Sequence, residues 1–108
     1  MATAAPAPLV APLLSEAEAL ATAALFHVLG DPTRVRIVNL LANRGGPACI
    51  CDLVEELGVA QATVSHHVRK LVEAGLLHRE ERGKWSYLSI DADACRQLGG
   101  LVDFGTCC

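Results

Sequence analysis

The sequence has few aromatic residues, with one Trp, one Tyr and two Phe among 108 residues, although 52% of the chain is hydrophobic. Its apolar content is therefore mainly Ala, Val, Leu and Ile, a composition that packs helices together. A chain of this length can bury one modest core but not two independent ones. We expect a single, mostly helical domain.

Lys and Arg are absent before Arg34, and the formal net charge is −3. A negative overall charge argues against a nucleic-acid partner, because domains that bind nucleic acid usually carry a basic excess. The distribution of charge weakens this argument, since basic residues gather in one short window: Arg69, Lys70, Arg79, Arg82 and Lys84. We expect a phosphate-facing surface in this window.

The N-terminal segment MATAAPAPLVAPLL lacks both the basic start and the unbroken apolar run of a secretory signal. No stretch of the chain approaches the ~20 apolar residues of a membrane span. We therefore expect residues 1–14 to form a disordered arm on a cytoplasmic protein. In that compartment, five cysteines favour free thiols or metal thiolates over a disulfide framework.

Capping residues and apolar spacing predict five helices. Ser15 with Glu18 forms a capping box, Asp31 with Pro32 is a second helix start, and Gly58 suits a left-handed helix end. The expected helices lie at residues 15–29, 32–42 and about 51–57, within 60–75, and from Asp91 or Asp93 to near Gly105. In the second of them, Val35, Val38 and Leu41 should face the core.

The predicted helix within residues 60–75 has two different faces. Its apolar stripe should point inward and consists of Val64, Val68, Leu71 and Val72. The opposite face and its shoulders are polar at the start and basic further on: Gln61, Thr63, Ser65, His66, Arg69 and Lys70. A helix of this kind fits the major groove of DNA.

After Gly75 the hydrophobic period changes from helical to alternating. LLHREERGKWSYLSI contains two β-prone runs separated by Arg82-Gly83, which predicts a hairpin with a basic tip. The order of elements is that of a winged helix-turn-helix, in which a supporting helix precedes the DNA-reading helix and the hairpin reaches the adjacent backbone. We thus predict a mainly α fold, with five helices and a two-stranded wing over residues 15–104, followed by a cysteine-containing tail over 105–108.

Four segments in this order resemble the ArsR/SmtB family of metal-responsive repressors, in particular its arsenic-sensing members. They are LGDPTRVRIVNLL, CICDL, QATVSHHVRKLVEAGLL and RGKWSYLSI. The resemblance implies a homodimer, held by the first and last helices, that binds an inverted-repeat operator and leaves it when a toxic ion binds.

The resemblance also implies roles for the polar residues of the recognition helix and wing. Base edges and nearby backbone would be contacted by Gln61, Thr63, Ser65 and His66, and phosphates by Arg69, Lys70, Arg82 and Lys84. For each basic residue the alternative is a merely solvated surface. A structural role is expected for His27, His67 and His78.

Cys49 and Cys51 lie one residue apart at the start of the short third helix. Inside a regular helix such side chains point ~160° apart and cannot bind one ion together. At a helix start the backbone can turn one sulfur toward the other, and the helix dipole favours the thiolate there. Soft thiolate donors select thiophilic ions, so we expect As(III) or Sb(III), with Cd(II) or Pb(II) as alternatives.

Trivalent arsenic takes three thiolates, and Val54 stands where the resembled arsenic sensors place a third Cys. We expect Cys107, Cys108 or both to complete the site, within one protomer or between two, whereas Cys95 is expected to be a small buried hydrophobe. Asp93 and Phe104 replace ligands of the family's zinc site. A disulfide between the tail and Cys49 or Cys51 is a further possible trigger.

Two other classes of protein would also use reactive cysteines. A thiol enzyme such as an arsenate reductase needs an anion-binding loop, and PACICDL has no phosphate-cradling glycines or nearby Arg. Such an enzyme would also have no use for the polar helix or the wing. A soft-metal chaperone would have a labile, exposed thiol pair and no affinity for DNA, so an operator shift assay would separate it from a repressor. We therefore expect a DNA-binding protein that is not an enzyme.

Overall fold

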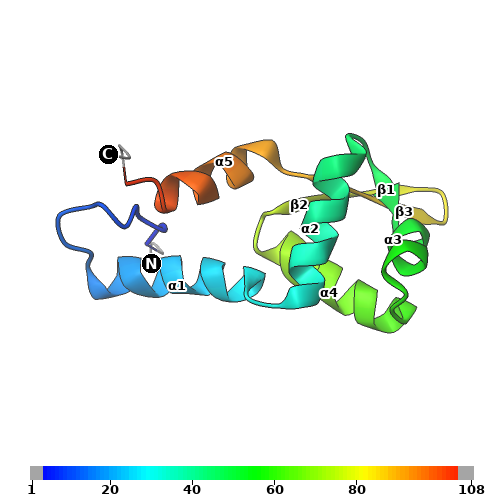
Figure 1. The fold of residues 1–108 in the computed structure, drawn as a ribbon, viewed down its shortest axis with the longest axis horizontal. Helices are drawn as coiled ribbons and strands as arrows, with labels where there is room; N and C mark the ends of the chain where they lie inside the picture. Colours follow the sequence, from blue (N-terminus) through cyan, green and yellow to red (C-terminus); the bar gives the residue numbers. More distant parts are fainter. Residues whose placement is uncertain (1–3, 105–108) are drawn as a thin grey trace.

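The structure is a computed structural model, and it describes residues 4–104. This part of the chain forms five helices and a small antiparallel sheet, as predicted, except that the sheet has three strands (Figure 1). The helices are α1 (Glu16–Leu29), α2 (Pro32–Arg44), α3 (Ile50–Leu57), α4 (Gln61–Glu73) and α5 (Ala92–Leu101). The strands are β1 (Ala48–Cys49), β2 (Leu77–Arg82) and β3 (Trp85–Ile90).

The helix starts and ends follow the capping signals. Ser15 and Glu18 form both bonds of the predicted capping box, and the Asp31 carboxylate accepts two backbone N–H groups at the start of α2. This helix runs two residues beyond the predicted end, because Gly45, with φ 75°, is the first residue in the left-handed conformation that ends it.

The predicted two-stranded wing is confirmed as β2 and β3, and an additional short strand, β1, extends its sheet. β1 pairs with β3 through Ala48 opposite Leu88 and Cys49 opposite Tyr87, which gives the strand order β1-β3-β2. Two residues are too few to show an alternating pattern, so this strand has no sequence signal. The hairpin turn is also displaced by one residue from the predicted Arg82-Gly83, because Arg82 pairs with Trp85 and leaves Gly83-Lys84 as the turn.

The core lies between α2, α3, α4 and the inner face of the sheet. Its largest fully buried side chains are Ile37, Leu53, Val64, Val68, Leu71, Leu76 and Leu88. The predicted inward stripe of α4 is confirmed, since three of its residues are completely buried and Val72 is half-buried. In α2, Leu41 is buried as expected, but Val35 is 50% exposed, because Ile37 turns toward the core in its place.

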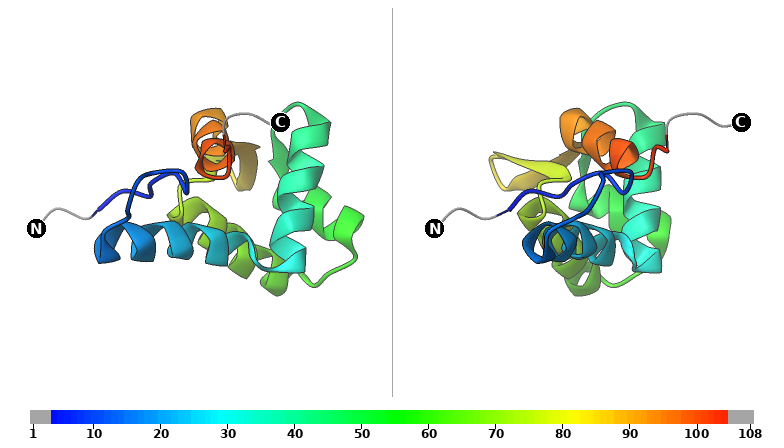
Figure 2. Two further views of the ribbon diagram at one scale, coloured as in Figure 1. Left: turned by 60° about the vertical axis from the view of Figure 1, so that its left-hand side comes forward. Right: turned by 90° about the vertical axis from the view of Figure 1, so that its left-hand side faces the viewer.

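α1 and α5 project from one side of this core, with the segment before α1 lying between them (Figures 1 and 2). In that segment the Ala7 backbone N–H donates to Thr22 Oγ1 at 3.0 Å, and the Leu9 backbone N–H donates to the Leu101 carbonyl at 2.9 Å. The arm predicted at residues 1–14 thus contacts both helices over its described part. Its boundary, and that of the tail, stay predictions.

Large apolar side chains are exposed on this projecting part of the molecule: Leu13, Leu20, Val102 and Phe104. Residues 4–104 contain no helix with the length and apolar character needed to cross a membrane.

Candidate sensor site and nucleic-acid interface

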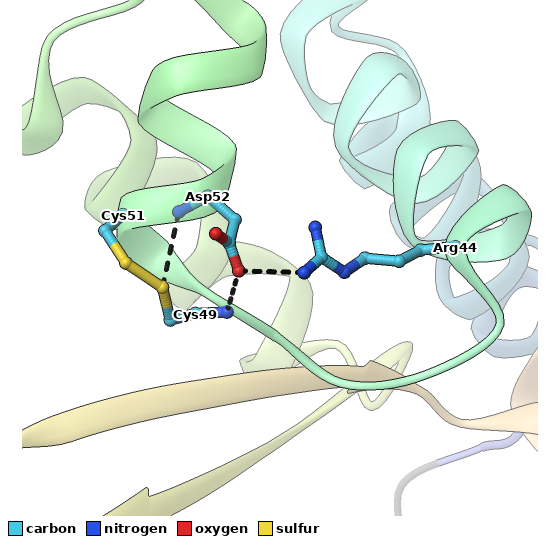
Figure 3. Close-up of a disulfide and its surroundings, with 4 residues drawn as sticks. All are labelled: Arg44, Cys49, Cys51 and Asp52. Carbon is cyan, nitrogen blue, oxygen red and sulfur yellow. Dashed lines mark hydrogen bonds and ion pairs between the residues drawn. A yellow bond between two sulfur atoms is a disulfide. The ribbon is translucent and has the colours of Figure 1, made fainter.

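Cys49 belongs to two elements at once. It ends β1, and its extended backbone (φ −81°, ψ 162°) makes it the N-cap of α3. Its sulfur accepts a hydrogen bond from the Asp52 backbone N–H at 3.3 Å, and its own N–H donates to the Asp52 carboxylate at 3.1 Å (Figure 3). These two bonds form a capping box in which sulfur replaces the usual hydroxyl.

Because Cys49 is outside the helical conformation, its side chain can turn toward Cys51 in the first turn of α3. The two sulfurs form a disulfide across a Cα–Cα distance of 5.2 Å (Figure 3), within the range that disulfides adopt. The expected meeting of the two sulfurs at a helix start is observed. The disulfide differs from the considered pairing with the tail, because it joins these two cysteines to each other.

Asp52 is a site residue to which the sequence analysis gave no role. Its carboxylate pairs with the Arg44 guanidinium at 3.2 Å, which links the start of α3 to the last residue of α2. Within residues 4–104, Cys49, Cys51 and Asp52 are the one group of three metal-ligating side chains, with donor atoms within 4.8 Å of one another. An acidic residue three positions after a helix cap is a capping-box signal, so the sequence did contain a clue to this role.

A cleft of about 410 Å³ opens beside the two cysteines. α3, the start of α4 and the wing form its walls, and its lining includes Cys49, Cys51, Gln61, Ser65, Lys84 and Trp85. The structure therefore brings the proposed ion ligands together with three of the predicted DNA-contacting residues. Sequence spacing alone did not predict this proximity.

The predicted DNA-facing side of α4 is open to solvent. Gln61, Thr63, His66, Arg69 and Lys70 are exposed, and Ser65 is half-buried. Desolvation, followed by the nearby charges of His67 and the basic residues, lowers the pKa of His66 below its ordinary value of 6.5. The lowered pKa favours the uncharged, hydrogen-bonding form of this ring.

His67 has the structural position that we predicted for it. Its Nδ1 accepts a hydrogen bond from Arg34 Nε at 3.0 Å, while Arg34 Nη1 donates to the Val28 carbonyl at 3.1 Å. The Asp31 carboxylate lies 3.9 Å from His67 Nε2. The backbone N–H of Arg34 is the main cause of a lowered pKa at Asp31. This cluster attaches α4 to the junction of α1 and α2.

Ion pairs within the wing reduce its positive charge. Arg82 pairs with Glu80 at 3.2 Å, and the hydrogen bonds and charge of that carboxylate raise the pKa of Arg82. Arg79 likewise pairs with Glu81 at 2.9 Å. Lys84, at the turn, makes no ion pair with any residue from 4 to 104, so it is the wing cation most available to a phosphate.

Cys95 is separate from this site. Cys95 lies half-buried on α5, where burial and the charge of Asp91 raise the pKa of its thiol, and it is outside the group of metal-ligating side chains. Cys95 was predicted to be buried, and the structure shows it only partly covered. Cys107 and Cys108 lie outside the described residues. His78, also predicted to be structural, forms an ion pair with Asp91 at 2.9 Å.

The sequence pattern of bacterial regulatory proteins of the arsR family matches residues 31–79. An arsenical resistance operon repressor from Escherichia coli is 44% identical over 79 residues, 73% of this chain and 67% of that protein. A cadmium resistance regulatory protein, a CadC homolog from Staphylococcus aureus, is 34% identical over 85 residues, 79% of this chain and 69% of that protein.

Among solved structures, the AntR antimony-specific transcriptional repressor is similar with a TM-score of 0.69 and 31% identity, covering 82% of this chain and 80% of AntR. The matched segments contain the supporting helix, the polar helix and most of the core described above. The chain therefore belongs to the ArsR family of winged helix-turn-helix transcriptional regulators, and it is a DNA-binding regulator rather than an enzyme.

Proposed function

We propose that this protein is a homodimeric repressor of a metal-resistance operon in the cytoplasm. As(III) or Sb(III) bound to Cys49 and Cys51 would release it from an inverted-repeat operator. The observation that carries this proposal is the cleft shared by the two cysteines and by Gln61 and Ser65 at the start of α4. An ion held there is next to the residues that we expect to read the operator.

The geometry supports a direct route from the ion to the DNA. A thiophilic ion competes with the Asp52 N–H for the sulfur of Cys49, and this hydrogen bond caps α3. Only residues 58–60 separate α3 from α4, so a displaced helix start moves the neighbouring recognition helix. The coupling needed for regulation is about 1–3 kcal/mol, a 5- to 150-fold change in operator affinity.

The third donor is proposed to be Cys107 or Cys108. In Figure 1 the end of α5 and the start of α3 lie toward opposite ends of the long axis of the molecule, which measures 47 Å. Four residues after Phe104 span at most about 14 Å, so we propose that the tail thiol comes from the partner protomer. Cd(II) or Pb(II) is the alternative inducer, because Asp52 could add a carboxylate oxygen to the two thiolates.

The projecting helices support the proposed dimer. Leu20 on α1 is 66% exposed, and Phe104 after α5 is 67% exposed. Exposed apolar groups of this size at one end of a small domain are typical of an interface between copies. A two-fold dimer through α1 and α5 would place its two recognition helices about one DNA turn, ~34 Å, apart.

The test of the proposal is a titration of a protein–operator complex, followed by fluorescence anisotropy of labelled operator DNA. We expect As(III) and Sb(III) to release the DNA at lower concentrations than Zn(II), because the site offers two thiolates and lacks His. Release by Cd(II) and Pb(II) at still lower concentrations would identify the alternative inducer. A reduced protein that binds no operator would contradict the repressor function itself.

A second prediction concerns how much Arg69 and Arg82 each contribute to binding the phosphates of the operator. Replacing Arg69 with Gln should weaken operator binding and reduce the slope of log affinity against log salt by about 1, because one phosphate contact is lost. Arg82→Gln should change this slope less, since Glu80 already neutralises that guanidinium. The measurement is operator affinity at several salt concentrations, and equal slope changes in the two variants would contradict the assignment.

A further inference from the structure

We propose that Cys49 and Cys51 form a peroxide-reactive pair, and that its disulfide form remains bound to the operator but no longer responds to As(III). This inference rests on the proposed function and adds a second input to the same site. The oxidised protein would then stay on its operator when As(III) is present. This outcome is the opposite of a redox switch in which oxidation releases the DNA.

The two sulfurs differ in accessibility as a peroxide-reactive pair requires. Cys51 is exposed in the first turn of α3, whereas Cys49 is only 7% exposed and anchored by the capping box. A small oxidant can therefore reach Cys51 first. Cys49 then acts as the resolving thiol, because the backbone already holds the two residues at a disulfide distance.

Hydrogen-bond donors and charged side chains surround the pair. The Asp52 N–H donates to the sulfur of Cys49, and the N-terminal end of α3 carries a partial positive charge. Lys84, Arg79 and Glu55 line the cleft next to the pair, and Arg79 is already paired with Glu81. Cys95, by contrast, has a raised thiol pKa and serves as an internal control within the same chain.

The oxidation consumes one hydrogen peroxide and balances without another reactant. The Cys51 thiolate attacks one peroxide oxygen, an S–O bond forms, the O–O bond breaks, and the leaving hydroxide takes a proton to become water. The Cys49 thiolate then attacks the sulfur of the resulting sulfenic acid, an S–S bond forms, and a second water leaves. Two thiols are oxidised to one disulfide, and peroxide is reduced to two waters.

We expect the oxidised protein to keep its affinity for DNA, because the disulfide leaves α3 and α4 in place. With the pair closed, α3 is helical from Ile50 onward, both bonds of the capping box are present, and α4 keeps its polar face exposed. The disulfide is complete within one helix start and draws no donor from elsewhere. Neither sulfur then has a thiolate to offer As(III), so the protein loses its inducer site but not its DNA-reading surface.

The experiment treats full-length reduced protein with hydrogen peroxide, removes the oxidant, and maps disulfides by peptide mass spectrometry after alkylation of free thiols. Operator affinity and As(III)-induced release are then measured by anisotropy before oxidation, after oxidation, and after reduction with a phosphine. We expect a Cys49–Cys51 link, unchanged operator affinity, and an As(III) response that is lost on oxidation and recovered on reduction.

Two variants test which cysteines form the disulfide. Cys95→Ser should still form the link and still bind the operator when oxidised, whereas Cys51→Ser should form no link to Cys49. Loss of operator affinity on oxidation, or a disulfide that maps to the tail instead, would overturn the inference. Reduced wild-type protein that ignores As(III) would instead refute the proposed inducer, while the disulfide map and the operator affinity of the oxidised form would still be readable.

Discussion

A Cys49→Ser variant is expected to stay on its operator at As(III) concentrations that release the wild-type protein. The substitution removes one of the two thiolates at the start of α3, and the loss should equal the whole inducible change of about 5- to 150-fold. Serine is a preferred N-cap, so the capping box with Asp52 should persist. The variant should therefore bind operator DNA as tightly as the wild-type protein when no ion is present.

The matched control is Cys95→Ser, which removes a thiol from α5 and leaves the pair at α3 intact. This variant should respond to As(III) as the wild-type protein does, because Cys95 is outside the group of metal-ligating side chains. Anisotropy of labelled operator during As(III) titration measures both variants. Normal release of Cys49→Ser, or loss of response in Cys95→Ser alone, would place the sensor elsewhere.

Replacing Leu71 with Ala should lower the free energy of unfolding by about 2–5 kcal/mol, the range for a leucine deleted from a well-packed core. Leu71 is 0% exposed on the inner face of α4, where it packs with the residues that hold the recognition helix in place. Urea unfolding followed by circular dichroism measures the loss, at one fixed protein concentration because dimers gain stability with concentration.

Val35→Ala is the control for this measurement, because Val35 was expected in the core and is 50% exposed. A surface substitution of this kind should change stability by about 0.5 kcal/mol or less. If the two variants lose equal stability, the packing of α2 and α4 differs from that described above.

The fold was predictable because its signals are local. Ser15 with Glu18, Asp31 with Pro32, and the apolar stripe of α4 each show in a few neighbouring residues, and all three are observed. β1 was not predictable, since a two-residue strand is defined by its partner Tyr87 rather than by its own composition. The exposure of Val35 likewise depends on how α2 is rotated, which periodicity gives only to within one residue.

The candidate sensor site was predictable in its residue types but not in its surroundings. The spacing of Cys49 and Cys51 indicated a helix start, where the structure places them. The pairing of Asp52 with Arg44 and the cleft shared with Gln61 join residues from separate elements. Such contacts arise from tertiary packing, and no local pattern encodes them.

The double membership of Cys49 in β1 and α3 has a consequence for the kinetics of derepression. Its backbone is bonded to β3 of the wing, and its side chain caps the helix that precedes the recognition helix. The wing and the helix that supports α4 thus meet at Cys49. We expect a disturbance at this residue to weaken the proposed DNA contacts of the wing and of α4 together. In the proposed function, an inducer ion bound here would shorten the residence time of the repressor on its operator, so that the resistance genes would switch on without waiting for spontaneous dissociation.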